Sequence, residues 1–233
     1  LMFLDSDQAD TILGTALLIG TPFFIVFGWL SDKIGRKWIM LSGMLLAILT
    51  YRPIYKAMYV VTDIHQKEEV LAKTIRTSGL DEVHNASFET TEKEYTDGTS
   101  SKVTTSTTIG EAKETIKTTI TIQGKNRVWL TALIFIQIIY ITMVYGPIAA
   151  FLVEMFPVKI RYTSMSLPYH IGNGIFGGLL PAVSTYLASN AKTAQDPEFY
   201  LAGLWYPIII SATCFIIGAL YINKSIIHTN VND

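Results

Sequence analysis

Long stretches without a charged side chain divide this chain of 233 residues. Four of them reach about 20 mostly apolar residues, the length that an α-helix needs to cross a hydrocarbon layer about 30 Å thick. These stretches are Thr11–Leu30, Val128–Val153, Tyr162–Ala191 and Phe199–Asn223. A fifth stretch, Trp38–Val61, contains Arg52 and Lys56 near one end, where long basic side chains extend to the membrane interface. The pattern predicts an all-α membrane protein with five transmembrane helices.

A polar insert, residues 62–127, separates the second and third predicted helices. We expect a short amphipathic helix over His65–Thr77. Val103–Ile109 and Ile116–Ile122 alternate β-branched and polar residues with a period of two, which is typical of strands, and Gly110 opens a short polar connection between them. The insert has few large apolar residues to form a core, so a small β-containing module is predicted and disorder is the alternative.

The composition agrees with a membrane protein, because half of the residues are apolar and only 16% are charged. Soluble domains carry roughly 25% charged residues. A net charge of −1 gives no indication of a nucleic-acid partner. The single cysteine, Cys214, lies in the last predicted helix, which excludes a disulfide framework and a cysteine-based metal site.

Basic residues are concentrated in alternate short loops. The segments after the first, third and fifth helices carry Lys33, Arg36, Lys37, Lys159, Arg161 and Lys224. The charged residues of the N-terminal segment are all acidic, and Ser189–Glu198 has one base, Lys192. The positive-inside rule places the basic segments in the cytoplasm and the insert outside the cell. The predicted organisation is residues 1–61 with two helices, 62–127 as the extracytoplasmic insert, 128–223 with three helices and 224–233 as a cytoplasmic tail.

A distinctive motif occupies the loop between the first two helices. Within residues 28–37, Gly28 and Gly35 permit a tight turn where two helix ends come close. Asp32 can bind the Arg36 guanidinium or a helix N-terminus, and Lys37 faces the anionic leaflet with the other bases. An ordinary basic loop is the alternative reading.

A second charged segment follows the third helix. Glu154 and Arg161 flank Pro157, which we expect to end the helix and turn the chain. A carboxylate and a guanidinium beside the first motif can form an interhelical charge network with Asp32 and Arg36.

Together these residues resemble the major facilitator superfamily, whose signature loop reads G-x-x-x-D-x-x-G-R-K/R. Residues 154–163 and the glycine-rich residues 172–178 are similar to its metabolite–proton symporter branch, which includes proline/betaine and dicarboxylate carriers. That branch ends its tenth helix with E-x-F-P-x-x-x-R. Residues 50–55 also resemble the outer end of its ninth helix.

The resemblance implies that the five helices are helices eight to twelve of a twelve-helix carrier in a bacterial inner or plasma membrane. The chain is then expected to be a C-terminal fragment that requires the N-terminal half as its partner. Such carriers work by rocking two halves around a central site, so the charge network is expected to break and re-form. Residues 28–37 would then act in gating.

Polar residues inside the predicted helices are candidates for the substrate cavity. His170 is ionisable within an apolar stretch, and Tyr169 and Asn173 share a helical face by their spacing. Gln137, Tyr140 and Tyr145 lie partly on one face of the third helix, and Gln137 and Tyr140 are taken as further cavity candidates. The alternative for His170 is a hydrogen bond between helices or a position near the cytoplasmic end, and the alternative for the third-helix residues is packing between helices.

The function most consistent with the sequence is proton-coupled transport of a small polar metabolite, either a zwitterion such as proline or betaine or an organic anion. The proton is implied by the resemblance only. A non-transporting receptor or scaffold that displays the insert is the alternative. No nucleophile–base set, metal-binding spacing or phosphate loop indicates an enzyme, and no cofactor or metal is expected.

Overall fold

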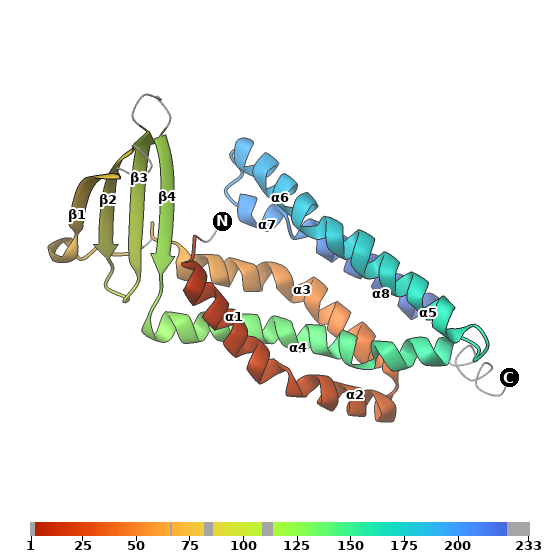
Figure 1. Cartoon of the computed structure of the whole chain (residues 1–233). Helices are drawn as coiled ribbons and strands as arrows, with labels where there is room; N and C mark the ends of the chain where they lie inside the picture. The colour runs from red at the N-terminus through yellow and green to blue at the C-terminus, as the bar shows by residue number, and fades with distance from the viewer. Residues whose placement is uncertain (1–2, 66, 82–85, 109–113, 223–233) are drawn as a thin grey trace. The chain divides into compact units, whose positions relative to one another are not determined.

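Figure 1 shows the computed structural model of the chain, which describes residues 3–65, 67–81, 86–108 and 114–222. Most of the described chain is helical, and one antiparallel sheet lies in the insert. The chain forms two compact units. One unit contains residues 1–16 and 57–134, and the other contains residues 17–56 and 135–233.

Four helical stretches are long and apolar enough to cross a membrane. They are α1 (Ser6–Gly20) with α2 (Pro22–Ile34), α3 (Arg36–Thr62), α4 (Gly124–Met155) and α7 (Phe199–Ala202) with α8 (Trp205–Tyr221). Each coincides with one of the five predicted stretches. The first is divided at Pro22, because proline lacks the N–H that would continue the hydrogen bonding of α1. The chain is therefore a multi-pass membrane protein.

The remaining predicted stretch is helical but irregular. It forms α5 (Arg161–His170), the π-helical segment η2 (Ile171–Gly177) and α6 (Gly178–Thr193) in direct succession. Pro168 lies inside α5 and Pro181 inside α6, and each removes one donor from the helix. These prolines bracket the segment of wider turns. The count of five transmembrane helices stays a prediction.

The insert contains a four-stranded antiparallel sheet in the order β1-β2-β3-β4. The strands are β1 (Ile75–Asp81), β2 (Ala86–Glu94), β3 (Ser100–Thr108) and β4 (Glu114–Thr121). The predicted hairpin is confirmed, since β3 pairs with β4 and Val103 faces Thr118. Its connection at Gly110 lies outside the described residues. Strands β1 and β2 were not predicted and extend the hairpin into a meander.

The helix predicted over His65–Thr77 is wrong. Its described part contains one short 3₁₀ turn, η1 (Leu71–Lys73), followed by β1 from Ile75. Leu71 and Ile75 are exposed, so these residues do not form the buried apolar face that stabilises most helices in proteins. The β-branched residues of this segment instead pair with β2, where Ile75 faces Glu92.

Specific polar contacts attach the sheet to the helix ends of its own unit. The Gln8 side chain of α1 donates to the carbonyl of Ile122 at 2.6 Å and accepts from the Ile122 N–H at 2.8 Å. Lys67 forms an ion pair with Asp97 at 2.7 Å, and Asn126 of α4 donates to the same carboxylate at 2.7 Å. The insert is thus fixed to α1 and α4.

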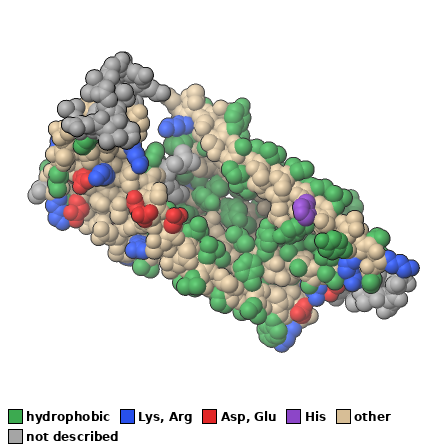
Figure 2. Space-filling view, viewed as in Figure 1, with side chains coloured by type: hydrophobic (Ala, Val, Ile, Leu, Met, Phe, Trp, Pro, Cys, Tyr) green, Lys and Arg blue, Asp and Glu red, His purple; other side chains and the backbone are tan. Residues whose placement is uncertain are grey.

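In the other unit, α7 and α8 pack against α3. Leu201, Leu204 and Ile208 form a buried cluster with Ile48, Tyr51, Tyr55 and Tyr200. Many large apolar side chains remain outside this core, and Leu18 and Ile25 are more than 75% exposed. Figure 2 shows hydrophobic side chains over the helices, whereas charged side chains gather over the strands and near helix ends. Such a surface suits contact with hydrocarbon.

Candidate functional site

The loop between α2 and α3 is a tight turn built on Gly35. This residue has φ +107°, a conformation that side chains with a Cβ rarely adopt, and its N–H donates to the Ser31 carbonyl at 2.9 Å. Ser31 is buried, and its hydroxyl donates to the Gly28 carbonyl at 2.6 Å. The turn therefore depends on glycine and fixes where Asp32 and Arg36 point.

Helices α2 and α4 approach closely at Gly28 and Gly146. A Cβ on Gly146 would lie 3.0 Å from the Phe24 carbonyl oxygen and 3.3 Å from the Gly28 nitrogen. Only small residues allow two helix backbones to come so near. Sequence reasoning recognised Gly28 through the motif but did not identify Gly146 as its partner.

The structure brings three of the predicted charged residues together. The Arg36 guanidinium binds Asp32 at 3.1 Å and Glu154 at 2.8 Å. One guanidinium, at the start of α3, therefore connects carboxylates from α2 and α4, and the Arg36 side chain is only 20% exposed. Bonds between two ionised groups are stronger and more directional than neutral ones. This arrangement can hold the three helix ends in one geometry and can be dismantled by moving one partner.

Pro157 and Arg161 shape the adjoining turn. The α4 helix ends at Met155, and the Arg161 Nε donates to the Phe156 carbonyl at 3.1 Å. Within the described residues, no ion pair joins Arg161 to Asp32 or Glu154. Arg161 thus stabilises the turn that follows α4.

Lys37, the last residue of the motif, binds the end of a different helix. Its ammonium donates to the carbonyls of Ala219 at 3.0 Å and Ile222 at 2.5 Å. These carbonyls lie at the C-terminus of α8, where the helix dipole favours a cation. The loop of residues 28–37 is therefore connected to α4 through Arg36 and to α8 through Lys37.

A small pocket lies between α4 and the irregular helix. It has a volume of about 170 Å³ and is lined by Tyr145, Tyr169 and Asn173 together with four apolar or small residues. The Tyr145 hydroxyl donates to the Asn173 side-chain carbonyl at 3.0 Å. Asn173 belongs to η2, and π-helical turns are frequent at functional sites. The sequence placed Tyr145 on one face with Gln137 and Tyr140, but its contact with Asn173 was not predicted.

The other three cavity candidates lie elsewhere. His170 does not line this pocket, and its Nδ1 lies 2.7 Å from the Ser166 carbonyl oxygen. Tyr140 accepts a hydrogen bond from Thr50 of α3 at 3.2 Å. Gln137 is half-buried on α4 and is also absent from the pocket lining. For Tyr140, a hydrogen bond between helices is the contact observed.

A second charged cluster joins α3 to the segment before α7. Glu198 binds Lys56 at 2.8 Å and Arg52 at 3.1 Å, and the Arg52 guanidinium lies 5.1 Å from the Trp205 ring centroid. The hydrogen bond from Lys56 and the nearby positive charges lower the pKa of Glu198. Sequence reasoning treated Arg52 and Lys56 only as interfacial side chains and missed Glu198 as their shared partner.

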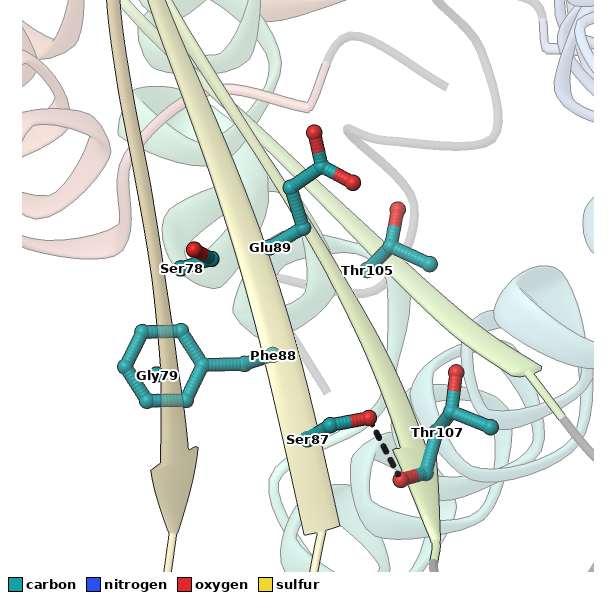
Figure 3. A pocket seen from close by; sticks show the side chains of 7 residues that line it. All are labelled: Ser78, Gly79, Ser87, Phe88, Glu89, Thr105 and Thr107. Atoms are coloured by element: carbon teal, nitrogen blue, oxygen red, sulfur yellow. Dashed lines mark hydrogen bonds between the residues drawn. The ribbon is translucent and has the colours of Figure 1, made fainter.

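The sheet carries a hollow of its own. Its volume is about 510 Å³, and Figure 3 shows Ser78, Ser87, Glu89, Thr105 and Thr107 around it. The Phe88 ring lies over Gly79, where a Cβ would be 2.8 Å from the ring. The hollow offers hydroxyl groups and one carboxylate. Among the described residues, no group of three or more His, Cys, Asp or Glu side chains is placed to hold a metal ion.

Comparison with known proteins links the chain to transporters. It is 30% identical over 119 residues to a Haemophilus influenzae protein whose given name is that of a metabolite transport protein. It is also 37% identical over 59 residues to a citrate-proton symporter of Salmonella typhi, and 26% identical over 95 residues to one of Klebsiella pneumoniae.

These similarities cover part of each protein. The matched residues make up 51, 25 and 41% of this chain and 25, 14 and 20% of the respective relatives. No protein-family profile matches the chain, and no solved structure matches it. The relatives support a role in transmembrane transport.

Proposed function

We propose that the chain is part of a secondary transporter that carries a small polar metabolite across the membrane, together with protons. The observation that carries this proposal is the Arg36 bridge between Asp32 and Glu154, because it occurs in the signature loop that resembles the major facilitator superfamily. The relatives named as transporters favour the same conclusion.

In this proposal, the irregular helix over residues 161–193 is the fifth transmembrane helix, and the five correspond to helices eight to twelve of a carrier in a bacterial plasma membrane. An N-terminal half completes the transporter. The signature loop and the segment of Pro157 lie in the cytoplasm, and the insert over residues 62–127 lies outside.

The charge network gives the proposal a mechanism. Arg36 holds the cytoplasmic ends of α2, α3 and α4 together in one state of the carrier. When the two halves rock around the central site, this contact breaks and re-forms. Both carboxylates are partly exposed, so the cost of separating them from Arg36 is small, as for most surface ion pairs.

The pocket of Tyr145, Tyr169 and Asn173 is the proposed substrate-contacting part of this half. It offers hydroxyl and amide groups but no lysine or arginine among its lining residues. It therefore suits a hydroxyl or carboxyl group of a small organic acid, or the polar end of a zwitterion. Two relatives are named for citrate, which favours an organic anion as the first substrate to test.

The decisive experiment is uptake by the complete carrier in membrane vesicles. Labelled citrate, 2-oxoglutarate, betaine and proline are supplied with a proton gradient, with and without an uncoupler. We expect uptake of at least one substrate and its loss with the uncoupler. Absence of uptake for all four would remove support for the metabolite classes, and uptake insensitive to the uncoupler would contradict proton coupling.

Variants of the same carrier test the network. We expect Asp32→Asn and Arg36→Ala each to reduce uptake by up to about five-fold, the factor that corresponds to the roughly 1 kcal/mol at the upper end for an exposed ion pair, while membrane insertion is unchanged. Lys159→Ala is the matched control, because this exposed cation lies in the adjoining turn. Unchanged uptake in Asp32→Asn and Arg36→Ala would remove the proposed gating role.

A receptor or scaffold is the second candidate function, favoured by the hydroxyl-lined hollow on the sheet. It predicts that the complete protein binds a ligand through this hollow and gives no flux. Glu89→Gln would then weaken ligand binding, whereas a transporter would keep its uptake.

A further inference from the structure

A narrow apolar cavity lies between α3, α4 and α8, at the end of these helices next to the signature loop. Its volume is about 190 Å³, and its wall is almost entirely apolar. The lining includes Met40, Leu41, Met44, Phe151, Ile217 and Cys214, with Lys37 at the end nearest the loop. Such a wall excludes a polar metabolite but accepts a hydrocarbon chain, and methionine side chains adapt readily to one.

The cavity is amphipathic along its length, as a lipid molecule is: one end is charged and the rest is apolar. Lys37 and Met44 are seven residues apart on α3, which corresponds to about 10 Å along the helix axis. One end of the cavity therefore carries an ammonium group, and the remainder is hydrocarbon-like.

Two exposed tryptophans mark the charged end as the membrane interface. The Lys33 ammonium lies 3.9 Å from the Trp29 ring centroid, and the Lys37 ammonium lies 5.6 Å from that of Trp38. Both rings are more than half exposed. Tryptophan is enriched at the level of lipid headgroups, so Lys37 lies at headgroup depth.

The charge at this end favours an anion. Arg36 is already bound to two carboxylates, whereas Lys33 and Lys37 have no acidic partner among the described residues. Lys37 uses two of its three N–H donors on the α8 carbonyls, which leaves one for a ligand. A free phosphate would satisfy the lysine but would leave the apolar cavity unfilled.

We infer that this cavity binds one acyl chain of an anionic phospholipid whose phosphate lies at Lys37. The lipid would lie against α3 and α8 next to the signature loop, where its headgroup charge would add to the contacts of Lys37. This inference concerns the membrane-embedded chain and does not require that it transports any particular metabolite.

Cys214 provides a direct readout, because it lines the cavity and is the single cysteine of the chain. The full chain is placed in nanodiscs of phosphatidylcholine, with or without phosphatidylglycerol, and its alkylation by N-ethylmaleimide is timed. We expect the anionic lipid to slow alkylation about five-fold, given roughly 1 kcal/mol for one lysine near a charged headgroup. Lys37→Ala should abolish this protection, and Lys33→Ala should keep most of it.

Three results would overturn the inference. Equal alkylation rates in the two membranes would exclude a specific anionic lipid, and equal loss of protection in Lys33→Ala and Lys37→Ala would indicate surface charge alone. Full protection in lipid-free detergent would show that no anionic headgroup is required, because a detergent tail can fill the cavity. Met44→Phe, which fills part of the cavity without removing the lysine, should reduce the difference in alkylation rate between the two membranes. It serves as a second variant if Lys37→Ala does not fold, and an unchanged difference would contradict the acyl-chain site.

Discussion

At the scale of single residues, Arg36 links the ends of three helices at the loop of residues 28–37. It binds two carboxylates from different helices, yet Asp32 is 62% exposed and Glu154 is 32% exposed. Ion pairs with this degree of exposure contribute about 0–1 kcal/mol to stability. The value of the Arg36 contacts therefore lies in geometry, since they set which helix ends are held together.

Gly35 allows the backbone turn that brings Asp32 and Arg36 together. With φ +107°, Gly35→Ala should destabilise the protein by about 1–3 kcal/mol, because the new Cβ would be strained in this conformation. Thermal unfolding in detergent should show a lower midpoint for this variant. Gly14→Ala is the control, since nothing lies within 4 Å of its added Cβ inside α1, and its midpoint should not fall. A similar midpoint for both variants would contradict the claim that this turn requires glycine at position 35.

Residues of the loop could be identified from the sequence because their spacing is local. Asp32 and Arg36 are four residues apart, so one turn of chain brings them within reach. Glu198 and the partner of Tyr145 could not be found in this way. Glu198 lies more than 140 residues from Arg52, and the partner of Tyr145 is 28 residues away in a π-helical turn.

At the scale of elements, the sheet is the feature that distinguishes the insert from a flexible loop. Lys67, Thr99 and Asn126 all bind the carboxylate of Asp97, and Asn126 belongs to α4. Burial alone would raise the pKa of Asp97, but the hydrogen bonds from Lys67 and Thr99 outweigh it and lower the pKa from 3.8 to about 2.

This shift predicts a pH dependence for the attachment of the sheet. A carboxyl group with a lowered pKa stabilises the folded state above its unfolded pKa, so the contribution of Asp97 is complete above about pH 4 and is lost as the pH falls towards 2. Hydrogen exchange of the Thr99 amide in the full chain measures this contribution of Asp97, because the Thr99 N–H donates to the Asp97 carboxylate at 3.0 Å.

Asp97→Asn should remove the acid dependence of this protection. The control is Glu92→Gln, because the ion pair of Glu92 with Lys102 is on an exposed part of the sheet and should not affect Thr99. Protection that stays constant between pH 4 and 2 in the natural chain would contradict the assigned role of Asp97.

The elements also differ in how far their own sequence specifies them. The long apolar helices follow from length and hydropathy, and β3 and β4 follow from strict alternation of residues. The segment His65–Thr77 contains a weaker helical pattern, and pairing of β1 with β2 overrides it. The π-helical segment η2 contains glycines and lies between Pro168 and Pro181, and no simple periodicity marks its turns.

At the scale of the whole molecule, the number of crossings determines the arrangement across the bilayer. The described chain has four stretches that can cross a membrane and an irregular helix between the third and fourth. Five crossings place the loop of Lys33 and the turn of Lys159 on one side. If the irregular helix does not cross, these two segments remain on the same side, but the chain end after α8 moves to the other.

Single-cysteine labelling tests this arrangement in the full chain with Cys214→Ser as background. Cysteines replacing Lys33, Lys159 and Thr115 are treated with a membrane-impermeant maleimide on intact and opened cells. We expect Lys33→Cys and Lys159→Cys to react only after opening, and Thr115→Cys in β4 to react in intact cells. A fourth cysteine, in place of the exposed Gln195 after α6, should react in intact cells because the irregular helix crosses in the proposed arrangement. Reaction of Lys33→Cys and Lys159→Cys on opposite sides would overturn the proposed topology and the transporter assignment with it.

The sequence by itself determined that this is a multi-pass membrane protein, because hydrocarbon imposes the length and polarity of each crossing helix whatever its neighbours are. It also determined the signature loop and one hairpin, since both depend on residues close along the chain. Only the tertiary structure decided that Arg36 reaches Glu154, that Gly28 meets Gly146 and that Lys37 caps α8. These contacts join residues more than 100 positions apart, and their formation depends on which helix faces pack together.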